Sequence, residues 1–278
     1  MKQIPLYFMK YAGNVVTMVI LMLLLSCSES QTKVLPAHAH NDYEHRNPLS
    51  DALGCRFKSV EADVYSIGDS LFVAHDSVDI KPGRTLRRLY LDPLRRRIAE
   101  NGGSVYGEGT ELFLFVDIKD DAVRTYKLLH KILADYSEML TCYRDGAVSF
   151  GNVRVIISGN RPLKLMQEQP LRYAFYDGRM NDLDSGPDTS LMPVVSDNWN
   201  NYFTWHGQGE MPEREKQQLT SIMQKARGRG CTVRFWATPD QPGKERTAVW
   251  TELKKQGVGL IGTDDLNGLK VFLSESKE

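Results

Sequence analysis

Short apolar runs recur along the chain after residue 33, separated by longer segments in which apolar and polar residues mix. The runs are rich in Val, Ile, Leu and Phe, which is typical of strands buried in a sheet. Eight of them predict strands, at residues 34–37, 59–64, 112–119, 154–158, 173–177, 192–197, 232–236 and 259–264.

Helix signals fill most of the intervals between these strands. Residues 47–54 have a proline near their start and a glycine at their end, which is typical of a short helix. The other predicted helices cover residues 85–101, 120–136, 213–229 and 245–256. Strands that alternate with helices form a parallel sheet, and eight of them predict a single-domain α/β fold, the closed (β/α)₈ barrel.

Two carboxylates lie on one face of the second predicted strand. Glu61 and Asp63 alternate with apolar residues, so both side chains point to the same side. Adjacent carboxylates repel each other, and a hard divalent cation bound by oxygen ligands relieves that repulsion. Taken alone, such a pair is more often a solvated strand face, so the neighbouring residues decide the interpretation.

Histidines follow two of the apolar runs. Residues 34–37 lead into His38 and His40, and residues 71–74 lead into His75. In folds built from parallel strands, the C-terminal ends of the strands carry the residues that meet substrate. Two histidines that flank a pair of carboxylates therefore favour a catalytic site over structural histidines.

The third predicted strand contributes one more acid and a lysine. Asp117 lies near the end of this strand, and Lys119 lies on the same face. Lys119 either binds a phosphate oxygen of a substrate or neutralises Asp117. We expect both side chains to lie at the same rim of the barrel as the histidines.

The order and spacing of these residues resemble the superfamily of glycerophosphodiester phosphodiesterases and phosphatidylinositol-specific phospholipases C. That superfamily has a histidine at the end of its first strand, a Glu-x-Asp in its second, a second histidine soon after, and an acidic residue at the end of its third. The corresponding residues are His40, Glu61, Asp63, His75 and Asp117. The resemblance implies a TIM barrel.

The resemblance also implies a metal-dependent phosphoric diester hydrolase that acts on a glycerophosphodiester or a phospholipid-headgroup type of substrate. His40 and His75 would be the catalytic acid and base. The ligands of one divalent cation, Ca²⁺ or Mg²⁺, would be Asn41, Glu61, Asp63 and Asp117.

Two residues depart from the pattern of the superfamily. Asn41 stands where the glycerophosphodiester branch usually has an arginine. An asparagine at this position resembles the phospholipase C branch, in which it is a metal ligand. Asp117 stands where a glutamate is usual, so its carboxylate is one methylene closer to the strand. These departures affect ligand distances and metal preference more than the general chemistry.

Later segments add candidate substrate contacts. Trp236 ends the seventh predicted strand, and the resemblance places a tryptophan there against the substrate. Arg161 and Arg234 either bind phosphate or form ion pairs on the surface or within the barrel. Residues 199–205 include four aromatic residues, which indicate a lid or pocket wall, a surface for lipid headgroups, or ordinary loop packing.

The sequence leaves two other functions open. His38 and His40 form an H-x-H pair, as in barrel-shaped amidohydrolases and histidinol-phosphatase-like phosphoesterases, where zinc, iron or manganese is bound by nitrogen. A further histidine pair is missing after His75, which weighs against this class. The other alternative is a lipid-anchored barrel that binds headgroups without turnover, and the presence of both histidines and all three acids weighs against it.

The N-terminus resembles a bacterial lipoprotein signal at residues 1–26. Lysines precede an apolar run at residues 15–25, which is too short to span a bilayer. Cys27 would become the lipidated first residue, with residues 27–33 as a tether and residues 34–278 as the barrel domain. We expect an exported protein anchored through Cys27 to a bacterial membrane, periplasmic or at the cell surface, with a plain secretory signal as the alternative.

The balance of charged residues bears on which kinds of partner the protein binds. The 35 basic and 35 acidic residues balance, so charge gives no argument for nucleic-acid binding. We expect a monomer that binds a small phosphodiester or phospholipid-derived substrate. Three further cysteines are too widely spaced for a zinc site or a disulfide scaffold, and we expect mostly buried thiols at Cys55, Cys142 and Cys231.

Overall fold

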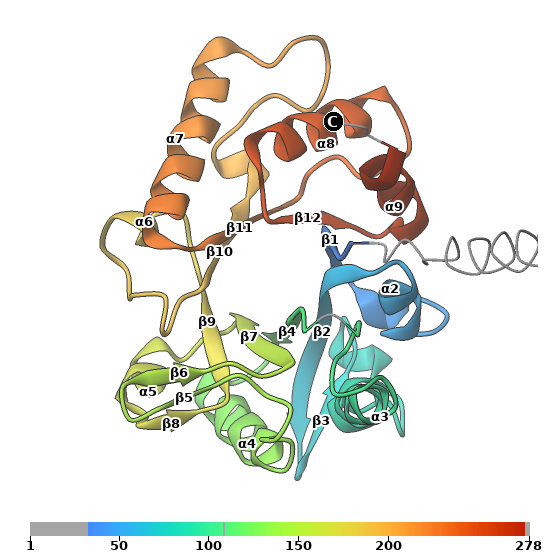
Figure 1. Cartoon of the computed structure of the whole chain (residues 1–278), viewed down its shortest axis with the longest axis vertical. Helices are drawn as coiled ribbons and strands as arrows, with labels where there is room; N and C mark the ends of the chain where they lie inside the picture. The colour runs from blue at the N-terminus through green and yellow to red at the C-terminus, as the bar shows by residue number, and fades with distance from the viewer. Residues whose placement is uncertain (1–32, 108, 276–278) are drawn as a thin grey trace, which may run out of the picture. The chain divides into compact units, whose positions relative to one another are not determined.

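Eight parallel strands close into a barrel in the computed structural model, which describes residues 33–107 and 109–275 (Figure 1). The barrel closes because the first strand pairs with both the second and the last. The predicted (β/α)₈ barrel is therefore confirmed. Its strands are β1 (Leu35–Ala39), β2 (Phe57–Ile67), β4 (Leu112–Ile118), β7 (Val153–Gly159), β9 (Ala174–Gly178), β10 (Val194–Asn198), β11 (Thr232–Trp236) and β12 (Leu260–Thr263).

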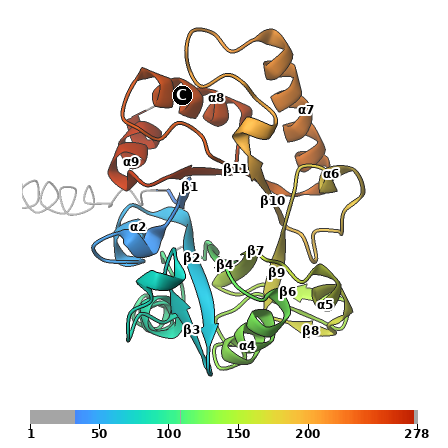
Figure 2. The ribbon, with the colours of Figure 1, turned by 180° about the vertical axis from the view of Figure 1, so that it is seen from behind.

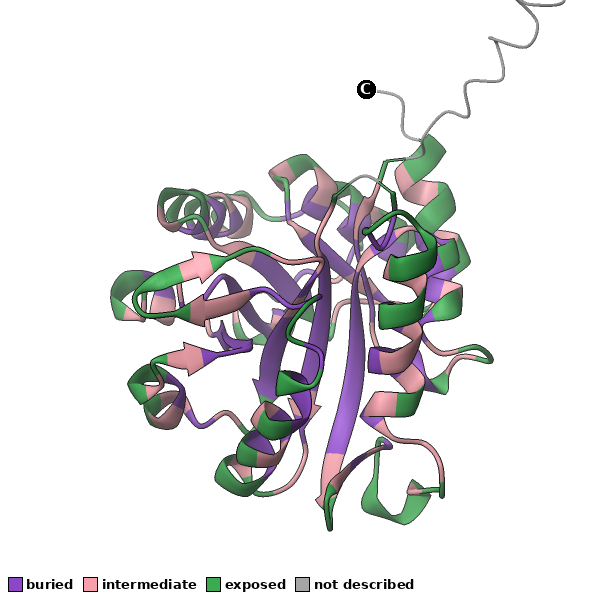
Figure 3. Ribbon diagram, turned by 60° about the horizontal axis from the view of Figure 1, so that its bottom comes forward, coloured by how far each residue is buried: buried purple, intermediate pink, exposed green. Residues whose placement is uncertain are grey.

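Helices surround these strands, as Figures 1 and 2 show from opposite sides. The longer ones present an apolar stripe to the barrel and a polar face to solvent, and Figure 3 shows buried strands inside partly exposed helices. The helices are α2 (Ser50–Gly54), α3 (Asp92–Glu100), α4 (Ala122–Ala134), α5 (Leu163–Glu168), α6 (Asp182–Ser185), α7 (Glu213–Arg229), α8 (Lys244–Gln256) and α9 (Leu266–Glu275).

The apolar run at residues 71–74 is not a barrel strand. It forms β3 (Ser70–Val73), which pairs antiparallel with the long strand β2 after a turn at Gly68. Gly68 has φ +57°, a backbone conformation that suits glycine in a tight turn. This hairpin folds back along β2, and the Ala74 backbone N–H donates to the backbone carbonyl of Asp63 at 3.3 Å. His75 therefore reaches the rim from a returning hairpin, not from the end of a parallel strand.

A second small sheet also lies outside the predicted pattern. It consists of β5 (Cys142–Arg144), β6 (Ala147–Ser149) and β8 (Leu171–Arg172), paired antiparallel. Its strands have two or three residues each, too short for a periodic pattern to show in the sequence.

Aromatic and branched side chains fill the inside of the barrel. Phe113, Phe115 and Phe175 are buried there together with aliphatic side chains of neighbouring strands. A much larger core lies between the strands and the helices. Because apolar side chains fill the interior, a substrate can enter only at the mouth, above this packing.

The aromatic loop at residues 199–205 packs into the core. Trp199 and Phe203 are buried, with ring centroids 4.1 Å apart, and both contact the ring of Phe235 on β11. The Trp199 indole N–H donates to the backbone carbonyl of Trp205 at 2.8 Å. Ordinary packing therefore accounts for Trp199 and Phe203, the two rings that the sequence also allowed as a lid or a lipid-facing surface.

The predicted signal at residues 1–26 and the lipidation site Cys27 lie outside the described residues, as does most of the tether. Within the described part of the chain, no helix is both long and apolar enough to cross a membrane. The cysteines Cys55, Cys142 and Cys231 are free thiols, of which the first is buried and the other two are partly buried.

Candidate active site

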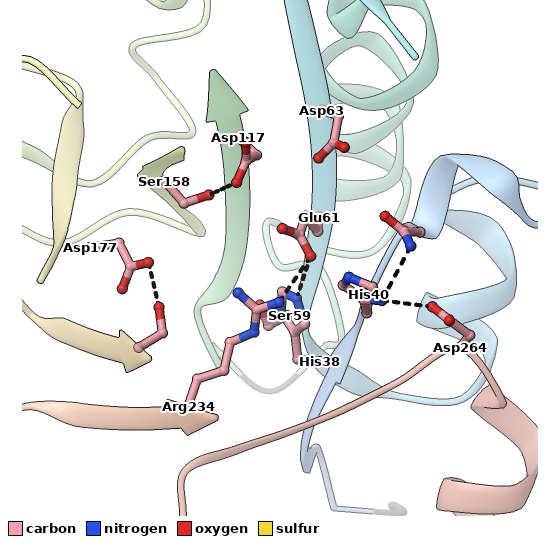
Figure 4. A network of polar contacts seen from close by, with 12 residues as sticks. His38, His40, Ser59, Glu61, Asp63, Asp117, Ser158, Asp177, Arg234 and Asp264 are labelled. Atoms are coloured by element: carbon pink, nitrogen blue, oxygen red, sulfur yellow. Dashed lines mark hydrogen bonds and ion pairs between the residues drawn. The ribbon is translucent and has the colours of Figure 1, made fainter. Parts of the chain in front are cut away.

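Three carboxylates converge at the mouth of the barrel. Glu61 and Asp63 point inward from β2, and Asp117 on the neighbouring strand β4 stands directly opposite Asp63 in the strand register. One oxygen from each carboxylate lies within 4.8 Å of the others, and Figure 4 shows the three side chains turned toward one another. The two-residue period of the strand thus places both acids of the Glu-x-Asp pair on the inner face.

Two cations contact these acids directly. The Lys119 ammonium lies 2.8 Å from Asp63 Oδ2 and 3.1 Å from Asp117 Oδ1. The Arg234 guanidinium, on β11, lies 3.0 Å from Glu61 Oε2. Burial opposes the charge on Lys119, but its two carboxylate neighbours outweigh that effect and raise its pKa. Lys119 therefore stays charged between the two aspartates.

The two acids of β2 respond to these neighbours in opposite ways. Burial favours the neutral form of Glu61, but Arg234 and a hydrogen bond from His38 outweigh it and hold the Glu61 pKa well below its usual range. Burial and the nearby charge of Glu61 raise the pKa of Asp63 to about 6, against the opposing effect of Lys119. Glu61 is thus ionised at neutral pH, while Asp63 titrates close to neutrality.

His40 lies just past the end of β1, where β12 also ends. Its Nδ1 lies 2.9 Å from the carboxylate of Asp264, the residue that follows β12, and 3.2 Å from the side-chain amide of Asn41. Burial lowers the pKa of His40, but the Asp264 hydrogen bond and the charge of Glu61 outweigh it, and the net effect is a raised pKa. The pairing of the first and last strands creates this histidine–carboxylate pair.

His75 contacts the site from the β2–β3 hairpin. Its Nδ1 lies 3.2 Å from Asp63 Oδ2 and 3.1 Å from the hydroxyl of Tyr43, while 57% of its side chain is exposed. Tyr43 belongs to the one-turn helix η1 (Asp42–Glu44) and is only 1% exposed. Its hydroxyl also lies 2.7 Å from Asp63 and 2.9 Å from the Asn41 amide.

His38 uses both ring nitrogens inside the barrel. Nδ1 lies 2.8 Å from the Ser59 hydroxyl and Nε2 lies 3.0 Å from Glu61 Oε2. Burial, followed by the charge of Arg234, lowers the pKa of His38 to about 3, so the ring is neutral. Since neither nitrogen is left for a metal, the geometry argues against the H-x-H type of metal site.

A cavity of about 340 Å³ opens beside the carboxylates. The candidate residues that line it are His40, Glu61, Asp117, Lys119, Arg234 and Trp236. Asn41, Asp63 and His75 are joined to this lining through the hydrogen bonds and ion pairs described above.

Arg161 does not reach the cavity. Its guanidinium donates to the backbone carbonyl of Asp177 and lies over the ring of Tyr176, 4.9 Å from the ring centroid. The structure thus places the Arg161 guanidinium against Asp177 and Tyr176, outside the lining of the cavity.

Other residues of the site were not singled out by the sequence. Arg179, Asp177 and Ser196 line the cavity together with Arg234, which the sequence left as a phosphate contact or an ion-pair partner. Arg234 lies two residues before Trp236 on the same strand, so the period of two could have predicted that both side chains point to the cavity. Asp264 carried no such signal, because only the closed barrel places it beside His40, and the contact of Tyr43 with His75 likewise depends on the tertiary structure.

The AIM6-like phosphodiesterase domain family matches residues 28–177 of this chain. One curated relative is the Altered inheritance of mitochondria protein 6 homolog of Arthroderma benhamiae, 28% identical, with 86% of this chain and 83% of the relative covered. Another is Altered inheritance of mitochondria protein 6 of Eremothecium gossypii, 31% identical, with 84% and 68% covered.

Two solved structures have a similar fold. The calcium-dependent phosphoinositol-specific phospholipase C of a Pseudomonas species has a TM-score of 0.51 at 13% identity, with 84% of this chain and 91% of that chain covered. The phosphatidylinositol-specific phospholipase C of Listeria monocytogenes has a TM-score of 0.50 at 9% identity, with 88% and 94% covered. At these identities the likeness shows the fold alone.

The predicted location is wrong. The relatives that the chain matches are fungal AIM6 proteins, not bacterial lipoproteins, and this contradicts a lipid anchor in a bacterial membrane. An apolar run followed by a cysteine is a short and weakly specific signal, so it could not decide the compartment.

The predicted relationship to phosphodiesterases, in contrast, is confirmed by the family match, and the solved structures share the predicted barrel fold. The chain belongs to the family of AIM6-like phosphodiesterase domains.

Proposed function

We propose that this protein is a metal-dependent phosphoric diester hydrolase that acts on a glycerophosphodiester or a phospholipid-headgroup type of substrate. The observation that carries the proposal is the convergence of three carboxylates and two histidines at one rim of the barrel. The family match and the adjoining cavity of about 340 Å³ support it.

The carboxylate cluster fits a hard divalent cation. Glu61, Asp63 and Asp117 offer oxygen atoms within 4.8 Å of one another. Oxygen ligands around one Ca²⁺ or Mg²⁺ lie about 2.0–2.6 Å from the ion, so ligands on opposite sides are separated by roughly twice that distance. A bound cation would polarise a phosphate oxygen and lower the pKa of a nearby hydroxyl.

The histidines would move the protons. Both have Nδ1 next to a carboxylate, Asp264 for His40 and Asp63 for His75, so Nε2 of each ring is available to a substrate. One ring would accept the proton of the attacking hydroxyl as the new O–P bond forms. The other would donate a proton to the leaving oxygen as its bond to phosphorus breaks.

Cationic and aromatic residues of the cavity would bind the substrate. Lys119, Arg179 and Arg234 place positive charge beside the carboxylates, where a phosphodiester anion would lie. Trp236 is 39% exposed at the cavity wall, so its ring can cover an apolar part of the substrate.

Hydrolysis of bis(p-nitrophenyl) phosphate, with and without the chelator EDTA, tests the proposal. We expect activity that EDTA abolishes and that added Ca²⁺ or Mg²⁺ restores, and we expect His40→Ala to lower kcat by about 10²-fold or more. His130→Ala is the matched control, because His130 stacks on Tyr173 with centroids 5.5 Å apart, on helix α4 outside the site.

Two results would contradict the proposal. Hydrolysis that persists in EDTA would remove the cation from the mechanism. Failure to hydrolyse any of a panel of phosphodiesters, with a cation bound, would instead favour a barrel that binds headgroups without turnover.

A further inference from the structure

A chain of hydrogen bonds links the two candidate catalytic histidines through Asn41 and Tyr43. His40 Nδ1 lies 3.2 Å from one end of the Asn41 side-chain amide, and the other end lies 2.9 Å from the Tyr43 hydroxyl. The same hydroxyl lies 2.7 Å from Asp63 Oδ2 and 3.1 Å from His75 Nδ1. Because Tyr43 is 1% exposed, these groups satisfy its hydroxyl in place of water.

The Tyr43 hydroxyl has one proton to share among three neighbours. It can donate one hydrogen bond and accept two. The Asp63 carboxylate is the nearest neighbour and, paired with the Lys119 ammonium at 2.8 Å, the strongest acceptor, so the proton points to Asp63. The Tyr43 oxygen must then accept from its other neighbours, which requires a proton on His75 Nδ1 and an N–H of Asn41.

Counting donors and acceptors around His40 Nδ1 likewise determines which atom of the Asn41 amide faces His40. Asp264 Oδ1 lies 2.9 Å from His40 Nδ1, and an ionised carboxylate only accepts, so Nδ1 carries the proton. If the Asn41 side-chain nitrogen faces His40, its N–H points at the N–H of His40 Nδ1. If the Asn41 oxygen faces Tyr43, it meets the Tyr43 oxygen, which is also an acceptor. A half-turn of the amide removes both conflicts and leaves the heavy-atom positions almost unchanged.

We propose that Asn41 and Tyr43 are positioning residues that bridge His40 and His75 and hold both rings in the tautomer with the proton on Nδ1. Nε2 of each ring is then left to exchange protons with a substrate. The inference rests on the proposed function, in which both rings transfer protons. It also directs the Asn41 oxygen to His40, whereas the family resemblance assigns Asn41 to the metal.

The backbone supports this arrangement. Asn41 has φ +47°, in the left-handed region that asparagine tolerates better than most residues. The Arg84 guanidinium donates to the backbone carbonyl of Tyr43. The backbone of Tyr43 is therefore held independently of its side chain.

Nitrogen-15 NMR of labelled histidine in the full chain reads the tautomers directly, without a substrate. In the wild type we expect neutral His40 and His75 to carry the proton on Nδ1. In Tyr43→Phe we expect part of the His75 signal to shift to the Nε2–H form. We expect kcat to fall about tenfold or more while KM changes less than about twofold.

Tyr65→Phe is the matched control. The Tyr65 hydroxyl donates to the backbone carbonyl of His75 at 3.1 Å, so this variant removes a hydrogen bond to the same residue but not to its ring. We expect wild-type tautomers and kcat within about twofold of the wild type. Unchanged His75 tautomers in Tyr43→Phe, or an equal change in both variants, would overturn the proposal.

Asn41→Asp tests the N–H end of the bridge. Aspartate keeps an oxygen for His40 and tolerates the left-handed backbone, but it has no N–H for Tyr43. If Asn41 bridges the two histidines, the substitution should lower kcat about tenfold without weakening the binding of Ca²⁺, which calorimetry measures. Wild-type kcat in this variant would overturn the bridge.

These readouts distinguish the inference from the proposed function. If the wild type hydrolyses no phosphodiester, the proposed function fails, and the NMR result still decides whether the bridge exists.

Discussion

The buried ion pair between Glu61 and Arg234 gives the sharpest test of how the barrel is held together at its mouth. The side chains are 6% and 5% exposed, and Arg234 Nη2 lies 3.0 Å from Glu61 Oε2. Substituting Arg234 by methionine removes the charge but keeps much of the volume, so the Glu61 carboxylate is left buried with His38 as its remaining partner. Breaking a buried pair in this way typically costs about 3–5 kcal/mol.

The assay is unfolding at pH 7, followed by denaturant titration and by calorimetry. We expect Arg234→Met to lower the free energy of unfolding by about 3 kcal/mol. For a domain of this size that corresponds to a decrease of about 6–12 °C in Tm. The double variant Glu61→Gln/Arg234→Met has no buried charge at either position, so it should be more stable than Arg234→Met alone.

The pH dependence has a defined sign. In the folded wild type the Glu61 pKa lies below its usual value of 4.5. The stability that this contributes is complete above that pH and is lost as the pH falls. Glu61→Gln should flatten this loss on the acid side. A cost below about 1 kcal/mol for Arg234→Met, or no gain from adding Glu61→Gln, would refute the reasoning.

Two further predictions concern the charged neighbours of the site. Lys119→Met should lower activity yet tighten the binding of Ca²⁺, because the Lys119 ammonium lies 2.8 and 3.1 Å from oxygens of Asp63 and Asp117; unchanged affinity by calorimetry would contradict this. Asp264→Ala should move the pH–rate limb of His40 to lower pH, because Asp264 raises the His40 pKa; an unmoved limb would exclude this pairing.

Much of the barrel was predictable because its strands are covered on the outside by helices and filled inside by side chains. Such strands read as short apolar runs, so all eight appeared in the pattern. The period of two placed Glu61 and Asp63 on one face, and the end of the next strand supplied Asp117. The inner face of β4 is a further example, with Phe113 and Phe115 buried below Asp117.

The local pattern of residues did not reveal the direction in which a strand pairs, or which residues distant in the sequence come into contact. The run before His75 read as another strand, but whether it paired parallel or antiparallel depended on the length of β2 and the turn at Gly68. The N-terminal pattern was a weak signal for location, and the fungal relatives contradict it.

By itself, the sequence determined the class of fold and the set of acids and histidines, because strand periodicity is a property of neighbouring residues. Only the tertiary structure decided their partners. His40 meets Asp264 across 224 positions, and Arg234 meets Glu61 across 173. Closing the barrel brings such residues together, and for the buried pair of Arg234 and Glu61 the low polarity of the interior then makes the contact strong enough to hold Glu61 ionised.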